Sequence, residues 1–450
     1  MTAAEKILQK ALVGSNIDSR EWNSVQAGLR DRAFFSSQVA ELQFLDAFRT
    51  GSAAHAAGAA DISKIRMVLR DYLTKKDYQP TDDIRGTIKD LTSKARLDVI
   101  LKTNVATARG FVRYANGMSP GAFAAFPAMK LLRIRQRRQG RAWDARWKAA
   151  GDSVGWKGAT PDFGARTALK DSPIWAALGA GAGGYSDGLG NPYPPFAWGS
   201  GVGVVDVSRK EAIDLGLISD EELREKTAEL EKQRDEGTLP GMNDNLSASF
   251  DAGHWSGDEV KFLHASFGDQ LKYTQDQATG NVTVQWQRCL LRDMFENYRK
   301  PSAEESGKGW NVGKATAKLL AECDKVSPKY RPIFEGRGLT LGPSFAKHTI
   351  DHGHWLVDNT PGNLPIMPAD VDLVPSLWRA PDYIEAGGEK DSIVLCLETF
   401  DGGVLKLPVQ VRRQVPIPTG LFKKEAPAST PTGIPRPALP RTPHSVPQTP

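Results

Sequence analysis

The chain has 450 residues, of which 40% are hydrophobic and 25% charged, as is normal for a protein with folded domains. A chain of this length divides into roughly two to four domains. The three cysteines, Cys289, Cys323 and Cys396, are odd in number and far apart, which excludes a disulfide-rich scaffold. No apolar run approaches the roughly 20 residues that span a bilayer, and the charged N-terminus differs from a signal peptide. We therefore expect synthesis in the cytoplasm and no membrane partner.

Residues 1–150 are expected to be mostly helical. Between Ser93 and Gly117, apolar residues recur at spacings of three and four and so share one helical face; they are Leu97, Ile100, Leu101, Val105, Ala108 and Val112. The stretch MKLLRIRQRRQGRAWDARWKAAG (129–151) predicts a second, basic helix in which Trp143 and Trp147 pack together.

The small net charge of +5 is unevenly distributed, because residues 94–170 hold 16 Lys and Arg against 4 Asp and Glu. Such a segment either contacts an acidic partner or nucleic acid, or forms a solvated basic face. The sequence leaves both interpretations open.

Residues 151–203 are rich in Gly, Pro and aromatic residues, which argues against helices there. The run GAGAGG (179–184) matches GxGxxG, but its flanks predict neither the preceding strand nor the following helix that a dinucleotide site needs. No cofactor is expected. Two capping boxes, Ser208 with Glu211 and Ser219 with Glu222, predict helix starts, and the second opens a charged helix. Residues 151–236 are therefore interpreted as a Gly/Pro-rich docking segment followed by that helix.

Residues 237–336 are interpreted as a polar linker and a helical connector, helical over 255–330 from a capping box at Ser256 and Glu259. Two β-rich runs, SIVLCLETF and GVLKLPVQVRR, flank the turn at 401–403 and predict a hairpin. Residues 337–424 are therefore expected to form a small α+β domain with an antiparallel sheet. The last 26 residues, 425–450, contain eight prolines and predict a disordered tail.

Four stretches resemble the minor head proteins of tailed phages and prophages that are related to the F protein of phage Mu. They are GTIKDLTSKARLDVILKTNVATARGF (86–111), FPAMKLLRI (126–134), ALKDSPIWAAL (168–178) and NPYPPFAWGSGVGVVDVSRKEAIDLGLI (191–218). The resemblance covers roughly residues 20–235, and its most specific part is the PYPPF box (192–196). The cysteine-bearing segment usual near that box is absent, which suggests a divergent branch. The resemblance implies a few-copy structural protein of head assembly that acts near the portal, with no chemistry in this half.

The stretch AKHTIDHGHW (346–355) holds three of the seven histidines, His348, His352 and His354, and has three interpretations. The H-x3-H spacing permits zinc, but Gly353 interrupts a helix and no cysteine or HExxH glutamate is near. The second interpretation is metal-free RNA cleavage, in which His348 and His352 serve as base and acid. The third is a cluster that only makes structural hydrogen bonds.

RNA cleavage also needs a cation beside the phosphate, and the candidates are Arg379, Lys406, Arg412 and Arg413. The sequences GLTLGPSFAKHTIDHGHW and VDLVPSLWRAPDYIEAG resemble phage nuclease-like domains grouped with barnase, EndoU, colicin and RelE-type RNases. That resemblance implies a helix with spaced histidines, then Pro381 and Asp382, then an antiparallel sheet. Against activity, residues 337–424 carry nine Lys and Arg but ten Asp and Glu, so no positive field covers the domain.

Together these observations predict a phage or prophage minor head protein that acts in virion morphogenesis near the portal and carries a C-terminal nuclease-like domain. Its expected partners are portal and capsid proteins, with packaged DNA at the basic segment and RNA at the C-terminal domain as further candidates. Its expected location is the virion head, reached from the host cytoplasm during assembly. The alternative function is a metal-independent RNase effector delivered by the virion.

Overall fold

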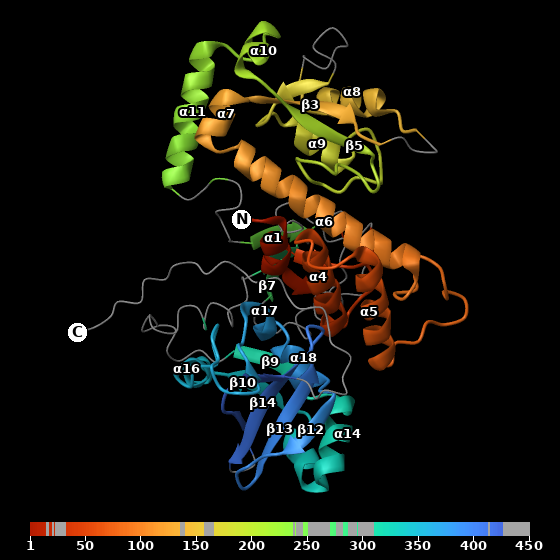
Figure 1. The fold of residues 1–450 in the computed structure, drawn as a ribbon, viewed down its shortest axis with the longest axis vertical. Helices are drawn as coiled ribbons and strands as arrows, with labels where there is room; N and C mark the ends of the chain where they lie inside the picture. The colour runs from red at the N-terminus through yellow and green to blue at the C-terminus, as the bar shows by residue number, and fades with distance from the viewer. Residues whose placement is uncertain are drawn as a thin grey trace, which may run out of the picture.

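The computed structural model describes residues 1–14, 33–135, 140–156, 166–236, 310–412 and 415–425, together with Asp18, Ser19, Trp22, Leu239, Phe295 and three strands between residues 246 and 286. Helices dominate the N-terminal half, and an antiparallel sheet organises the C-terminal domain, which confirms the expected fold class. In Figure 1 the long helix α6 runs from the N-terminal helices in the centre to a smaller unit at the top, while the C-terminal domain lies below.

The N-terminal helices are α1 (Ala3–Gln9), α4 (Leu42–Ala56), α5 (Ile62–Lys75) and α6 (Lys94–Gly117), with a short parallel pair of strands, β1 (Ala11–Val13) and β2 (Ala33–Phe35). The predicted helix between Ser93 and Gly117 is confirmed as α6. The Ser93 side chain caps this helix by accepting a hydrogen bond from the backbone N–H of Arg96. Five of its six predicted apolar positions are buried; Phe111 is buried in place of Val112.

The smaller unit holds a three-stranded antiparallel sheet in the order β4-β3-β5. Its elements are α7 (Pro120–Ala125), β3 (Ala128–Arg133), α8 (Trp143–Ser153), β4 (Thr167–Leu169), α9 (Ile174–Ala180), β5 (Val202–Val207), α10 (Arg209–Asp214) and α11 (Asp220–Asp235). The Ser208 and Ser219 side chains cap α10 and α11, which confirms both predicted helix starts.

Two predictions for this unit are wrong. Residues 129–133 are not helical, because they belong to β3, the central strand, which pairs with a strand on either side. Residues 174–180 form α9 although no helix was expected there, and this helix ends at Gly181, whose φ of 80° suits glycine. The GAGAGG run therefore begins in the last turn of a helix and does not follow a strand, unlike the dinucleotide fingerprint. Trp143 and Trp147 are packed in the core, as predicted, each 3% exposed.

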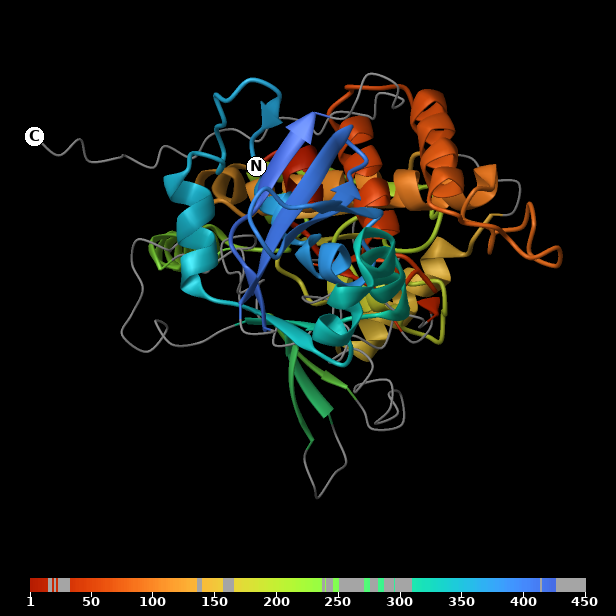
Figure 2. The same cartoon turned by 90° about the horizontal axis from the view of Figure 1, so that it is seen from below.

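The helical connector was predicted too broadly. Strands β7 (Leu271–Gln275) and β8 (Val282–Trp286) fall inside 255–330, and β8 pairs with β7 on one side and with β6 (Leu246–Phe250) on the other, so these residues form a sheet instead of a helix. These strands project from the body in Figure 2. Among the described residues from Trp310 onward, this region holds the α-helices α14 (Ala317–Val326) and α15 (Arg331–Phe334). The capping box at Ser256 and Glu259, and the Pro-rich tail beyond Glu425, lie outside the described residues.

The C-terminal domain contains a sheet in the order β11-β16-β14-β13-β12, with β15 also paired to β14. Its elements are β9 (Trp310–Lys314), β10 (Gly338–Leu341), α16 (Pro343–Asp351), β11 (Asn363–Leu364), α17 (Pro368–Val371), α18 (Val374–Arg379), β12 (Tyr383–Ala386), β13 (Ser392–Glu398), β14 (Gly403–Arg412), β15 (Val415–Pro418) and β16 (Phe422–Glu425). The predicted hairpin is confirmed: β13 and β14 pair from Glu398 and Val404 outward around the turn.

The N-terminal helices and the C-terminal domain bury their apolar side chains in one cluster, which we call the shared core. It joins Leu45 and Phe48 of α4 with Trp378 of α18 and Leu405 of β14. The smaller unit has two cores of its own, one around Trp147, Trp175 and Phe196 and one around Phe123 and Leu223. The C-terminal domain is therefore packed as part of the same body as the N-terminal helices.

Candidate functional site

The predicted histidine cluster lies at the C-terminal end of α16. The ring centroids of His348 and His352 are 4.1 Å apart, and His352 is the residue that caps the helix. Gly353 follows with a φ of 76°, so the chain turns away from the helix axis here. His354 therefore lies outside the helix, and its ring centroid is 6.5 Å from that of His352. All three imidazoles thus line one surface, with His348 and His352 exposed.

Two contacts fix the position of this helix against the sheet. The Thr349 hydroxyl donates to the carbonyl of Phe345 and accepts a hydrogen bond from the backbone N–H of Leu421, just before β16. The His348 ring lies against Gly420, where an added Cβ would be 2.5 Å from His348 Cδ2. Burial lowers the pKa of His348, and the neighbouring His352 and His354 lower it further, while Asp351 opposes them.

Sequence reasoning overlooked the best-oriented histidine. His354 Nδ1 lies 2.7 Å from Asp358 Oδ2, and the Asp358 side chain is 2% exposed. Burial alone would raise the pKa of Asp358, but hydrogen bonds from His354, Thr360 and Asn363 lower it overall, so this carboxylate stays charged. A charged acceptor at Nδ1 leaves the other ring nitrogen, Nε2, for chemistry. The H-x3-D spacing of these two residues was the available signal.

Of the predicted cations that the structure describes, Lys406 and Arg412 bind side chains outside the histidine cluster. Lys406 forms an ion pair with Glu385 at 2.6 Å, and Arg412 donates to Gln410 at 2.6 Å. These two cations are six residues apart on β14, which is about 20 Å along a strand. Arg379 ends α18, where its carbonyl accepts a hydrogen bond from Thr316, and Arg413 lies outside the described residues. Lys406 faces Phe422 across the sheet, and the Phe422 ring centroid lies 6.0 Å from that of His354.

A metal does not fit the described part of the cluster. Among the described residues, no group of three or more His, Cys, Asp or Glu side chains is arranged to hold a metal ion. The described cysteines, Cys323 and Cys396, are both buried and free, and burial raises the pKa of each thiol to about 12. They are therefore inert at neutral pH.

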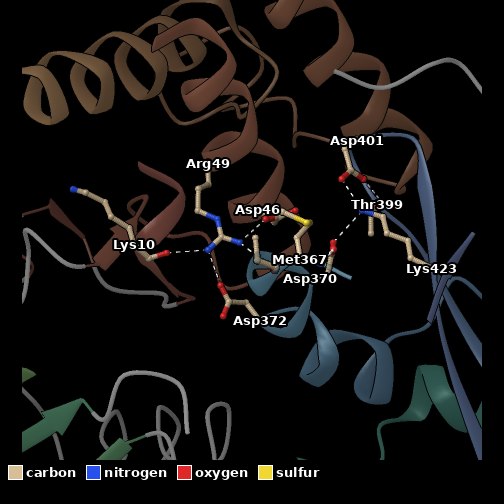
Figure 3. Close-up of polar contacts among 10 residues, drawn as sticks. Lys10, Asp46, Arg49, Met367, Asp370, Asp372, Thr399, Asp401 and Lys423 are labelled. Atoms are coloured by element: carbon tan, nitrogen blue, oxygen red, sulfur yellow. Dashed lines mark hydrogen bonds and ion pairs between the residues drawn. The ribbon is translucent and has the colours of Figure 1, made fainter. Parts of the chain in front are cut away.

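A second arrangement of functional interest is a buried charge network between α4 and the C-terminal domain (Figure 3). The Arg49 side chain is fully buried, and its two terminal nitrogens reach Asp372 at 2.6 Å and Asp46 at 2.7 Å. The same nitrogens donate to the carbonyls of Lys10 and Ala369. One guanidinium thus ties α1, α4 and α17 together.

The network continues on the other side of α17. Lys423 of β16 is 2% exposed and pairs with Asp370 at 3.1 Å and with Asp401 at 2.6 Å. Farther along the interface, Lys76 forms an ion pair with Asp382, and Lys75 forms one with Glu398. Burial lowers the pKa of Lys76, and Asp382 opposes that shift. Charges of the C-terminal domain are therefore neutralised by residues more than 300 positions earlier in the chain.

The PYPPF box is a packing element. Tyr193 is 3% exposed and Phe196 fully buried, and the Tyr193 ring contacts Phe111 of α6 with centroids 5.8 Å apart. At Gly110 of α6, an added Cβ would lie 1.7 Å from the Pro194 carbonyl oxygen, so glycine is needed for this contact. The box thus holds α6 against the smaller unit.

Eight of the 16 basic residues in the basic segment form ion pairs with carboxylates. Asp98 binds Lys94 and Lys102. The other ion pairs are Arg113 and Lys170 with Asp206, Arg141 and Arg146 with Asp187, Lys148 with Asp152, and Arg166 with Asp144. Arg96, Arg109, Lys130, Arg133 and Arg135 have no carboxylate partner among the described residues. The positive surface is therefore smaller than the sequence suggests.

Comparison of the chain with protein-family models, with curated proteins and with solved structures finds no match. Within the described residues no helix is long and apolar enough to cross a membrane.

Proposed function

We propose that this chain is a minor structural protein of a phage or prophage head, acting near the portal in virion morphogenesis, with its C-terminal domain as a fixed part of the subunit. The observation that carries the proposal is the ion pair of Arg49 with Asp372, buried inside the shared core. It favours a structural subunit over the alternative of a delivered effector, and the similarity to Mu F-like head proteins supplies the kind of assembly.

The physical reason is the cost of separating buried charges. Removing one partner of a buried ion pair destabilises a protein by about 3–5 kcal/mol, because the other charge stays buried without compensation. An effector domain must leave its carrier to reach a cellular substrate. Release of this domain would break the pairs at Arg49 and Lys76 and open the shared core. A domain attached in this way suits a subunit that keeps one shape.

The test is incorporation into particles. A tagged chain, expressed in cells that produce the phage or prophage particle, should copurify with heads at a constant ratio to the capsid protein. Heads purified without the chain, under conditions in which the cells contain it, would overturn the proposal. The exposed pair Arg209 and Asp220 offers a control variant, since Arg209→Gln removes a surface ion pair and should leave incorporation unchanged.

The geometry of the histidines favours a second candidate function, metal-independent RNA cleavage. In such a reaction one imidazole removes the proton of the 2′-hydroxyl, which attacks the phosphate, and a second imidazole protonates the leaving 5′-oxygen. Adjacent rings at His348 and His352, and a third at His354 oriented by Asp358, supply candidates for both roles. The ion pair of Lys406 with Glu385 and the balance of charge in residues 337–424 weigh against this function.

The experiment is cleavage of a generic RNA by the full chain, because a truncated C-terminal domain would lose Arg49 and Lys76. We predict that His348→Ala and His352→Ala each reduce the rate by roughly 10²- to 10⁴-fold, with a bell-shaped pH profile between about pH 5 and 8. His55→Ala, on α4, is the control and should keep the full rate. A chelator should have no effect. RNA left intact by the wild-type chain across this pH range would leave the cluster with a structural role only.

A further inference from the structure

A small pocket lies where α6, β2 and the segment after the Gly-rich run meet. Its volume is about 120 Å³. Its described lining combines hydroxyl and amide side chains with aromatic rings. It includes two basic residues and contains no Asp or Glu. Among the lining residues are Arg96, Val99, Trp22, Phe35 and Trp198. None of these residues takes part in the histidine cluster or in the buried charge network.

Arg96 is the unusual group in this pocket. One terminal nitrogen, Nη2, donates to the Ser36 hydroxyl at 2.8 Å and to the Ser37 carbonyl at 2.6 Å, and both acceptors are neutral. Its Nε is buried and lacks a hydrogen-bond partner. Burial lowers the pKa of this guanidinium, Tyr78 opposes the shift, and no carboxylate of the described residues does. Cations held away from water are normally paired with an anion, so this partly buried guanidinium lacks the counter-charge that its position calls for.

We infer that this pocket binds a phosphoryl group, with Arg96 as its charged ligand. A guanidinium presents donors in a planar fork that matches the oxygens of a phosphate. The serine, threonine and asparagine side chains of the lining, among them Ser36, Thr103 and Asn104, add neutral hydrogen-bonding groups. The absence of Asp and Glu from the described lining means that no carboxylate repels an anion.

The aromatic lining favours a nucleotide as the carrier of the phosphoryl group. Trp22 and Phe35 stack with ring centroids 4.2 Å apart, and Trp198 also lines the pocket. Aromatic side chains bind nucleobases by stacking, worth about 1–3 kcal/mol for each base. The pocket is large enough for a phosphoryl group, so the base would extend past Val99, whose side chain is 39% exposed at the rim. Free phosphate shares the same chemistry and is the other source.

The test is calorimetric titration of the full chain with inorganic phosphate, AMP and adenosine. Val99→Glu places a carboxylate three residues after Arg96 on the same helical face, where it pairs with the guanidinium. Val99→Gln is nearly identical in shape and neutral, and an exposed position tolerates both. We expect AMP and phosphate to bind the wild type and Val99→Gln, and to bind Val99→Glu at least about tenfold more weakly, as loss of 1.4 kcal/mol implies. Adenosine should not bind.

Tighter binding of AMP than of phosphate would identify a nucleotide, and equal binding would identify the free anion; both support the phosphoryl site. The inference fails if neither phosphate nor AMP binds the wild type, or if Val99→Glu binds them as tightly as Val99→Gln. Equal melting temperatures of the two variants would show that weaker binding does not come from unfolding.

Discussion

The pKa of His348 connects the histidine cluster to the stability of the protein. Burial and the two neighbouring imidazoles lower this pKa from its ordinary value of 6.5. The unfolded chain therefore takes up a proton at His348 more readily than the folded chain does. The contribution of His348 to the free energy of unfolding is fully present above about pH 6.5. It decreases as the pH falls toward the lower pKa that His348 has in the folded chain. Asp351 acts in the opposite direction and keeps the effect small.

We predict that His348→Gln makes the protein less sensitive to acid. Glutamine keeps polar atoms near Gly420 but does not titrate, so the fall in melting temperature between about pH 7.5 and 5.5 should be smaller than in the wild type. Thermal melts across this range, followed by circular dichroism, give the comparison. An unchanged pH dependence would mean that His348 titrates alike in the folded and unfolded chains.

Arg49 is the residue on which the connection between the two halves most depends. We predict that Arg49→Met lowers the free energy of unfolding by about 3–5 kcal/mol, because Asp46 and Asp372 remain buried after the guanidinium is gone. Arg66→Met removes a partly exposed arginine that pairs with Asp98, and it should cost about 1 kcal/mol or less. Urea denaturation of both variants makes the measurement. Equal losses would show that burial of the Arg49 pair adds nothing.

At the scale of elements, the contact between α6 and the PYPPF box can be tested by adding one methyl group at Gly110. Gly110→Ala would bring a methyl group within 1.7 Å of the Pro194 carbonyl oxygen, so one of the two elements must move. We predict a loss of at least about 1–3 kcal/mol, the usual cost of overpacking, although alanine favours helix. Gly121 of α7 has no atom within 4 Å of an added Cβ, and Gly121→Ala should be neutral or stabilising. Stability gained by Gly110→Ala would contradict this packing.

Elements whose pattern is local were predictable from the sequence. The α6 helix has a capping serine and a regular apolar face, and the β13–β14 hairpin has a glycine turn between two β-rich runs. Strand β3 was missed because its identity depends on pairing with β4 and β5, which lie far along the chain. Likewise, α9 was missed because its seven residues lie in a Gly/Pro-rich stretch, whose composition argues against a helix. Tertiary contacts decide such segments more than composition does.

The candidate site was predictable in part. The H-x3-H spacing placed His348 and His352 together, as the structure shows, because both positions belong to the end of α16. The role of Asp358 was missed because Gly353 ends the helix, and periodicity says nothing about the loop that follows. The contact of Arg49 with Asp372 spans 323 residues, a separation over which sequence spacing carries no information.

At the scale of the whole molecule, we expect the shared core to make the N-terminal helices and the C-terminal domain one cooperative unit, and the smaller unit to depend on its own cores. Leu407 of β14 and Leu131 of β3 are both fully buried leucines, and they lie in different cores. Truncation of a buried leucine to alanine costs about 2–5 kcal/mol. The two positions therefore form a matched pair with which to ask how far a local loss of stability spreads.

We predict that Leu407→Ala increases amide hydrogen exchange both in β13 and in α4, although α4 lies more than 300 residues earlier, because the two elements bury side chains in the same cluster. Amides of α8 and α9 should keep their protection. Leu131→Ala should give the reverse pattern. Exchange should become faster in α8 and α9 and stay unchanged in β13. Mass spectrometry of deuterated peptides measures both variants against the wild type. Faster exchange in β13 with unchanged exchange in α4 would show that the C-terminal domain unfolds by itself. The C-terminal domain would then not be a fixed part of a structural subunit.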